Sequence, residues 1–196
     1  MRKVMLITLA FTATTTLMMA QSMTKKHRSF EVSRELPFSA DKVWKAVAED
    51  YGNVANAHPK IIASQYAEGS LKGDKGAERM CYFNEKQTQL LHEQIVDWDP
   101  DKMTFVNRVL EAKKFPLDTE NTRATYKVES LGPNKSRISM KMEFRTKPAI
   151  MGFMAQGQFK GLLKDYFIAL EHHLRTGESV TGNNFKEIKR EHHYTR

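Results

Sequence analysis

The chain has 196 residues, of which 40% are hydrophobic and 28% charged, and its formal net charge at pH 7 is +8. This length and composition are typical of one globular domain that can form its own core, and they exclude a mainly disordered chain. Basic residues are interspersed with acidic ones along the chain. The sequence therefore predicts no nucleic-acid binding, despite its positive charge.

The first 22 residues have the pattern of a secretory signal peptide. A charged start at residues 2–3 precedes an uncharged, mostly apolar stretch at 4–19, and residues 20–22 (Ala-Gln-Ser) fit a signal-peptidase site. The apolar stretch is short for a hydrocarbon core of roughly 30 Å, so no integral membrane span is expected. We expect an exported protein, periplasmic or extracellular; a translation start at Met23 would instead give a cytoplasmic one.

The first strand and two short helices are predicted before residue 60. Residues 30–36 alternate apolar and polar side chains, as a half-buried strand does. Ser39 can cap a short helix whose apolar residues, among them Trp44, recur at helical spacing. A second short helix is predicted within residues 51–59.

Six more strand-like segments follow, separated by turn sequences such as Asp99-Pro100-Asp101. They cover residues 61–67, 77–83, 90–98, 103–110, 124–128 and 137–145. Short connections favour antiparallel pairing between sequence neighbours, and the alternation gives the sheet one apolar and one solvated face. The lone cysteine, Cys81, lies in one of these segments among apolar neighbours, which favours a buried thiol over a nucleophile.

A long helix is predicted over residues 148–174, with an apolar stripe that can cover the sheet. Its first half contains Gly152, Gly157 and Gly161. These glycines indicate either a close approach to the sheet or a loosely held segment that could open for a ligand. Residues 177–196 form a polar tail without a stripe and are expected to fray.

The order of these elements over residues 28–176 resembles the SRPBCC superfamily, which includes START lipid-transfer domains, the major birch-pollen allergen and polyketide cyclase/dehydrase-like proteins. Four segments carry the resemblance: residues 36–44, 51–61, 76–93 and 161–164. It implies an α+β helix-grip fold, in which a curved antiparallel sheet of about seven strands wraps around a long C-terminal helix. Two short helices follow the first strand.

The resemblance also implies a pocket between sheet and helix that holds a small hydrophobic molecule. The residues expected to face it are Tyr126, Val128, Met140, Met142 and Phe144 from the strands, and Phe153, Met154, Leu162, Tyr166 and Phe167 from the helix. Flexible methionines suit an adaptable cavity. The alternative is that these side chains simply fill a core.

Three polar residues match the family's motif positions, namely His58, Arg79 and Glu93. In an apolar cleft they could bind a carbonyl or carboxylate, or move a proton. Alternatively, Arg79 and Glu93 form a structural ion pair on adjacent strands, and His58 caps a turn before Pro59.

Neither a metal nor another cofactor is expected. Adjacent histidines, as at 172–173, point about 100° apart on a helix and cannot easily chelate one ion, and the pair at 192–193 lies in the polar tail. Two functions remain: a carrier or sensor of a hydrophobic molecule, or an aromatase/cyclase or dehydratase that uses the polar trio. An interaction domain that uses the sheet or the basic surface is a third class.

Overall fold

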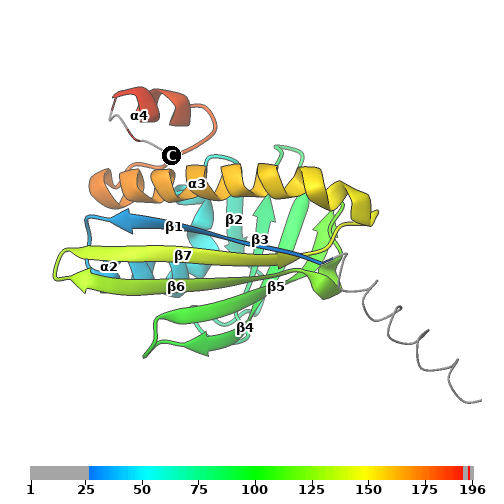
Figure 1. Cartoon of the computed structure of the whole chain (residues 1–196), viewed down its shortest axis with the longest axis horizontal. Helices are drawn as coiled ribbons and strands as arrows, with labels where there is room; N and C mark the ends of the chain where they lie inside the picture. The colour runs from blue at the N-terminus through cyan, green and yellow to red at the C-terminus, as the bar shows by residue number, and fades with distance from the viewer. Residues whose placement is uncertain (1–26, 192–193, 195–196) are drawn as a thin grey trace, which may run out of the picture.

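The structure is a computed structural model of the chain and describes residues 27–191 and 194. The predicted signal peptide lies outside the described residues. A curved sheet and one long helix lying across its concave side make up most of the molecule (Figure 1). None of the described helices is long and apolar enough to span a bilayer.

Seven antiparallel strands form the sheet, in the order β1-β7-β6-β5-β4-β3-β2. They are β1 (Arg28–Leu36), β2 (Ala63–Tyr66), β3 (Glu78–Tyr82), β4 (Leu90–Asp99), β5 (Thr104–Lys113), β6 (Arg123–Gly132) and β7 (Lys135–Phe144). From β2 to β7, consecutive strands pair with each other, as the short connections predict. Only β1 pairs out of sequence order, with Val32 opposite Met140 of β7.

Between β1 and β2 the chain makes short helical turns, as predicted. They are α2 (Ala40–Trp44), η1 (Lys45–Glu49) and η2 (Tyr51–Asn56). Ser39 caps α2, because its hydroxyl accepts a hydrogen bond of 3.3 Å from the Lys42 backbone N–H. Trp44 is buried and packs against Trp98, which anchors α2 to the sheet.

A turn of 3-10 helix, η3 (Thr119–Asn121), precedes β6, and another, η4 (Ala149–Met151), leads into α3 (Gly152–Thr176). The predicted apolar stripe is buried in the second half of α3, where Phe167 and Leu170 are at most 1% exposed. Gly177 ends the helix in the left-handed conformation, with φ of 77°. The predicted helix-grip fold is confirmed.

The three glycines of α3 do not share one role. A Cβ at Gly152 would lie 3.0 Å from Nε of Arg28, so this glycine does permit a close approach. At Gly157 and Gly161 a Cβ would meet nothing within 4 Å. The close-approach interpretation is therefore wrong for these two positions.

The expectation that the C-terminal tail frays is also wrong for much of its length. The tail forms α4 (Phe185–Glu191), which lies on the side of α3 away from the sheet (Figure 1). Val180 and Ile188 are buried with Ala169 of α3 in a small second core. The backbone N–H of Val180 also donates to the Asn56 carbonyl at 2.9 Å. A few apolar residues are enough to hold the tail, because the side of α3 that faces away from the sheet offers Ala169 for them to pack against.

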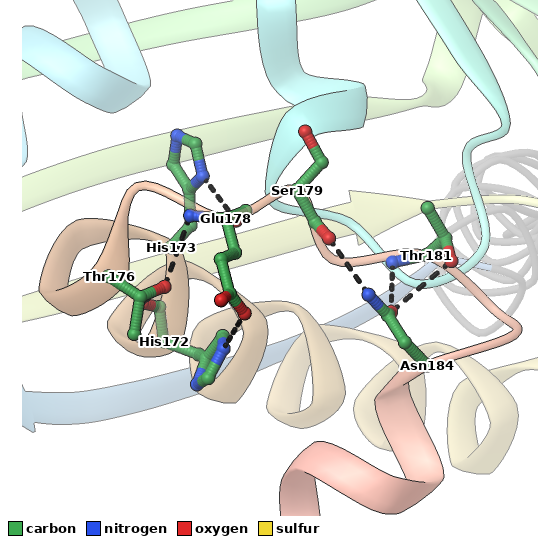
Figure 2. A network of polar contacts seen from close by, with 7 residues as sticks. All are labelled: His172, His173, Thr176, Glu178, Ser179, Thr181 and Asn184. Carbon is green, nitrogen blue, oxygen red and sulfur yellow. Dashed lines mark hydrogen bonds and ion pairs between the residues drawn. The ribbon is translucent and has the colours of Figure 1, made fainter.

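Polar contacts hold the turn that connects α3 to α4 (Figure 2). The Glu178 carboxylate lies 3.4 Å from Nε2 of His172, while the Glu178 carbonyl lies 2.7 Å from Nδ1 of His173. The Asn184 side chain accepts from the Thr181 N–H at 2.7 Å and donates to the Ser179 carbonyl at 2.9 Å. Across residues 27–191 and 194, no three metal-ligating side chains converge.

Candidate ligand-binding cavity

A partly open, mostly apolar cavity lies between the concave face of the sheet and α3. Its volume is about 130 Å³. An engineered apolar cavity of about 150 Å³ in another protein binds benzene, so this space suits a molecule of about one ring. It is larger than a packing defect and much smaller than a sterol or a long acyl chain.

Most of the predicted site residues line this cavity. His58, Arg79, Glu93, Tyr126, Met140, Met142, Leu162 and Tyr166 do so. The sequence interpretation missed other wall residues, namely Val54, Ile61, Cys81, Phe83, Leu91, Phe115, Leu117, Phe159 and Leu163. Of these, Phe159 and Leu163 belong to the predicted apolar stripe of the helix, although they were not among the residues expected to face the pocket.

Five residues that were expected to face the pocket lie elsewhere. Val128, Phe144 and Phe167 are buried in the core, where the Phe144 ring meets the Phe159 ring edge-on at 5.1 Å. Phe153 and Met154 are 75% and 73% exposed and point away from the cavity. Counting back from Phe159 in steps of three and four residues reaches 155, 156 and 152, so residues 153 and 154 are out of phase with the buried stripe. The expectation that they face the pocket is wrong for this reason.

A buried ion pair forms the polar end of the cavity. Arg79 of β3 and Glu93 of β4 are cross-strand partners. Nε of Arg79 donates to Oε2 of Glu93 at 2.8 Å, and Nη1 donates to the Tyr51 carbonyl at 3.1 Å. The guanidinium also stacks over the Tyr51 ring, 4.0 Å from its centroid. Burial opposes the charge on Arg79, but Glu93 outweighs it and the pKa of Arg79 stays well above its ordinary value.

The remaining oxygen of Glu93 is also occupied. Nδ2 of Asn107 donates to Oε1 at 3.2 Å and lies 3.3 Å from the Tyr51 hydroxyl. The Cys81 thiol lies 3.7 Å from Oε2. Burial raises the pKa of Cys81 to about 12, so this residue is a neutral thiol, as predicted, and not a nucleophile. Glu93 thus has donors on both oxygens, which suits a structural role.

His58 is neutral and is fixed in one tautomer. Its Nδ1 accepts from the backbone N–H groups of Lys60 and Ile61, at 3.1 and 3.2 Å. Burial, together with the nearby Arg79, lowers the pKa of His58 to about 3. The proton must therefore sit on Nε2, for which the described residues provide no acceptor. The expected turn-capping role is present, and it leaves one N–H at the cavity wall.

Two tyrosines add hydroxyl groups. Tyr166 of α3 stacks on the His58 ring at 5.1 Å, and its hydroxyl has no hydrogen-bond partner among the described residues. Tyr126 of β6 stacks on Phe105 at 4.5 Å, and its hydroxyl interacts with Arg79. Burial raises the pKa of both phenols, that of Tyr126 to about 12. Both tyrosines therefore remain protonated hydrogen-bond donors.

The result is a neutral, donor-rich end in an apolar cavity. The positive charge of Arg79 is balanced by Glu93, whereas His58 and Tyr166 present an N–H and an O–H. Buried polar groups need partners, so a molecule that brings a hydrogen-bond acceptor would satisfy these donors. A molecule that brings a negative charge would enter a site whose only cation is already paired.

Solved structures with this architecture include several that align over most of their length. Ara h 8.0201 is 21% identical, with a TM-score of 0.62, and the match covers 76% of this chain and 99% of that one. A Thermobifida fusca protein is 20% identical over 74% and 92%, with a TM-score of 0.61. Norcoclaurine synthase from Thalictrum flavum, solved with dopamine and hydroxybenzaldehyde, is 13% identical over 91% and 99%, with a TM-score of 0.57.

At this level of identity the solved structures show the fold alone. No curated protein sequence matches the chain. A family model described as polyketide cyclase/dehydrase and lipid transport matches residues 27–174, which is nearly the whole described domain. The chain therefore belongs to the polyketide cyclase/dehydrase and lipid transport family, within the SRPBCC superfamily.

Proposed function

We propose that the protein binds and carries a small, neutral, apolar molecule of about one ring that has a hydrogen-bond acceptor such as a carbonyl oxygen. The observation behind the proposal is the apolar cavity of about 130 Å³ with unpartnered donors at one end. Family membership supports a ligand-binding role. Norcoclaurine synthase, which shares the fold, was solved with two one-ring aromatic molecules, so the fold has room for such ligands.

In this proposal the acceptor oxygen of the ligand receives hydrogen bonds from His58 and Tyr166, whose rings stack on each other at one wall of the cavity. An oxygen between them would receive two hydrogen bonds, each worth about 1 kcal/mol net. A carboxylate is disfavoured because Glu93 already neutralises Arg79, and an unpaired buried charge is costly. The proposed ligand is thus a ketone, aldehyde or ether and not an acid.

A cyclase or dehydratase is the second candidate, favoured by the convergence of His58, Arg79 and Glu93 at one cavity. Such an enzyme could use Arg79 and the tyrosine hydroxyls to stabilise a developing enolate. It also needs a base. His58 has its lone pair on Nδ1 occupied by two amide donors, and both oxygens of Glu93 accept hydrogen bonds. Neither group is arranged as a base, and this favours carriage over catalysis.

Matched one-ring probes test the proposal. Acetophenone, ethylbenzene and benzoate have similar size but carry a carbonyl, no polar group and a charge, respectively. We expect affinity to fall in that order by ligand-observed NMR or thermal shift. Tyr166→Phe should weaken acetophenone about three- to tenfold and leave ethylbenzene unchanged, since one hydrogen bond is lost.

Filling the cavity provides the control. Leu162→Trp places a large ring in the cavity wall and should abolish binding of both acetophenone and ethylbenzene. Met154→Trp changes an exposed residue of the same helix and should change neither affinity. Equal affinity of the wild-type protein for all three probes, or tightest binding of benzoate, would contradict the proposed ligand chemistry.

A further inference from the structure

A cluster of large apolar side chains lies exposed where the chain enters α3. Ile150, Met151, Phe153 and Met154 are 84%, 42%, 75% and 73% exposed, and we call them the entry patch. Four large apolar residues within five positions are unusual on a soluble surface, where such residues are normally scattered. Two of them precede α3 and two lie in its first turn.

The surroundings of the entry patch are basic. From Arg145 to Lys164 the sequence contains four Lys or Arg residues and no Asp or Glu. A fifth cation, Arg28, lies over the Phe153 ring at 5.5 Å from its centroid. On a neighbouring segment, the buried Asp118 faces two of these cations, Lys147 and Arg145, at 3.2 and 3.7 Å. Positive charge therefore remains in excess around the patch.

One side of α3 runs from the entry patch toward the second half of the helix and carries a glycine and two lysines. Phe153, Gly157, Lys160 and Lys164 are spaced by four, three and four residues, so they lie along one side of α3. A Cβ at Gly157 would meet nothing, and Lys160 and Lys164 are both exposed. The apolar residues thus lead, and two cations follow along the same face, as in helices that lie in a membrane interface.

The entry patch also adjoins the cavity. Phe159 and Leu162, within two to three turns of Phe153 on α3, line the cavity. At the same end of the sheet, the Lys147 N–H donates to the Pro116 carbonyl at 3.0 Å, which ties the β5–β6 loop to the start of α3. Leu117 of this loop lines the cavity too. A surface that docks through the patch would therefore lie beside the cavity.

We infer that the entry patch is a docking site for an anionic lipid bilayer. Ile150, Phe153 and Met154 enter the boundary between headgroups and acyl chains, while Arg28, Lys160 and Lys164 bind lipid phosphates. Charge selects the occupant, because an anionic interface accommodates both the apolar side chains and the excess of positive charge around them. The inference does not rest on the proposed ligand, since its measurement is vesicle binding.

Vesicle co-sedimentation of the folded protein tests this. We expect binding to phosphatidylcholine vesicles that contain phosphatidylglycerol, weaker binding to phosphatidylcholine alone, and a loss of binding at high salt. The double variant F153S/M154S should reduce the partition coefficient on anionic vesicles by about tenfold or more. The charge variant K160E/K164E should do the same, since each basic residue near the surface contributes about 1 kcal/mol, or roughly fivefold.

Matched controls lie in the connection between β2 and β3 and on η1. Leu71→Ser removes an equally exposed apolar side chain, 58% exposed, and K45E/K75E reverses two exposed lysines. Both should bind vesicles like the wild type, and all variants should melt like it because these side chains are exposed.

Three results would overturn the inference. The first is that the wild type binds neither kind of vesicle. The second is that F153S/M154S binds anionic vesicles as tightly as the wild type does. The third is that the patch mediates self-association instead, so that the double variant abolishes a concentration-dependent dimer in sedimentation equilibrium while vesicles stay unbound.

Discussion

The two halves of α3 have the same secondary structure but different surroundings. From Leu163 to His172 most side chains are buried between the sheet and the C-terminal segment. Between residues 153 and 162 no residue is fully buried, and Phe153 and Met154 face outward. The second half is a structural element that closes the core. The first half has no fully buried side chain: Phe159 and Leu162 line the cavity, whereas Phe153 and Met154 belong to the exposed entry patch.

Matched phenylalanine truncations in the two halves should give the largest difference. Phe167→Ala removes a ring that is 0% exposed and should lower the free energy of unfolding by about 3–5 kcal/mol. Phe153→Ala removes one that is 75% exposed and should change it by less than about 0.5 kcal/mol. Urea unfolding measures both. Similar losses in the two variants would mean that the first half is packed as firmly as the second.

The sequence predicted the second half well because a repeating stripe has one physical explanation. Leu163, Phe167 and Leu170 recur at helical spacing, and burial against the sheet satisfies them. The pairing of Arg79 with Glu93 was also within reach, because antiparallel neighbours with a short connection share one register.

The first half was misinterpreted because residue type was weighed above helical phase. Phe153 and Met154 are apolar, but they lie on the side of the helix opposite to the stripe. The cavity itself could not be derived from the sequence. A gap of about 130 Å³ depends on where side chains such as Met140 and Phe159 stop, and the same residues could have filled it. The packing of Val180 and Ile188 on α3 was missed because two apolar residues make no periodic signal.

His58, which stacks on Tyr166 in the buried half, should make stability depend on pH. Folding lowers its pKa from 6.5 to about 3, so the unfolded chain binds an extra proton in between. Stability conferred by the neutral ring is present above pH 6.5 and is lost as the pH falls toward 3. Between pH 7 and pH 5 the loss should be about 2 kcal/mol.

His58→Asn should remove this dependence, because an Asn oxygen can accept from the Lys60 and Ile61 N–H groups but does not titrate in this range. His27→Asn, which changes an exposed histidine, is the control and should follow the wild type. Chemical denaturation at both pH values gives the comparison. An unchanged slope in the His58 variant would show that other groups cause the acid sensitivity.

Hydrogen exchange should separate the two halves within a single molecule. Amide protons of residues 153–160 lie in turns with no fully buried side chain, whereas those of residues 163–172 lie beneath packed ones. We expect protection in the first segment to be lower by a factor of ten or more, which corresponds to about 1.4 kcal/mol. If acetophenone enters past the first half, its binding should slow exchange there and leave the second half unchanged. Uniform protection along α3 would argue against a mobile entrance.

Glycine-to-alanine substitutions should give the smallest effect and test why the first half contains glycine. A Cβ at Gly157 meets no heavy atom within 4 Å, so Gly157→Ala should stabilise the protein by about 0.5–1 kcal/mol through helix propensity. At Gly152 a Cβ would lie 3.0 Å from Nε and 3.1 Å from Cδ of Arg28. That side chain donates to Gln156 and lies over Phe153, so Gly152→Ala should bring no gain.

The rates of ligand binding to Gly157→Ala then test whether the ligand enters past the first half of α3. If the loose first half admits the ligand, Gly157→Ala should slow both association and dissociation of acetophenone while the equilibrium affinity stays the same, because only the barrier changes. Stopped-flow mixing measures the rates, and thermal denaturation measures the stability. A destabilised Gly157→Ala variant would contradict the open space beside this residue. If the variant is stabilised but the rates are unchanged, the ligand does not enter past the first half of α3. The entrance would then lie between strands.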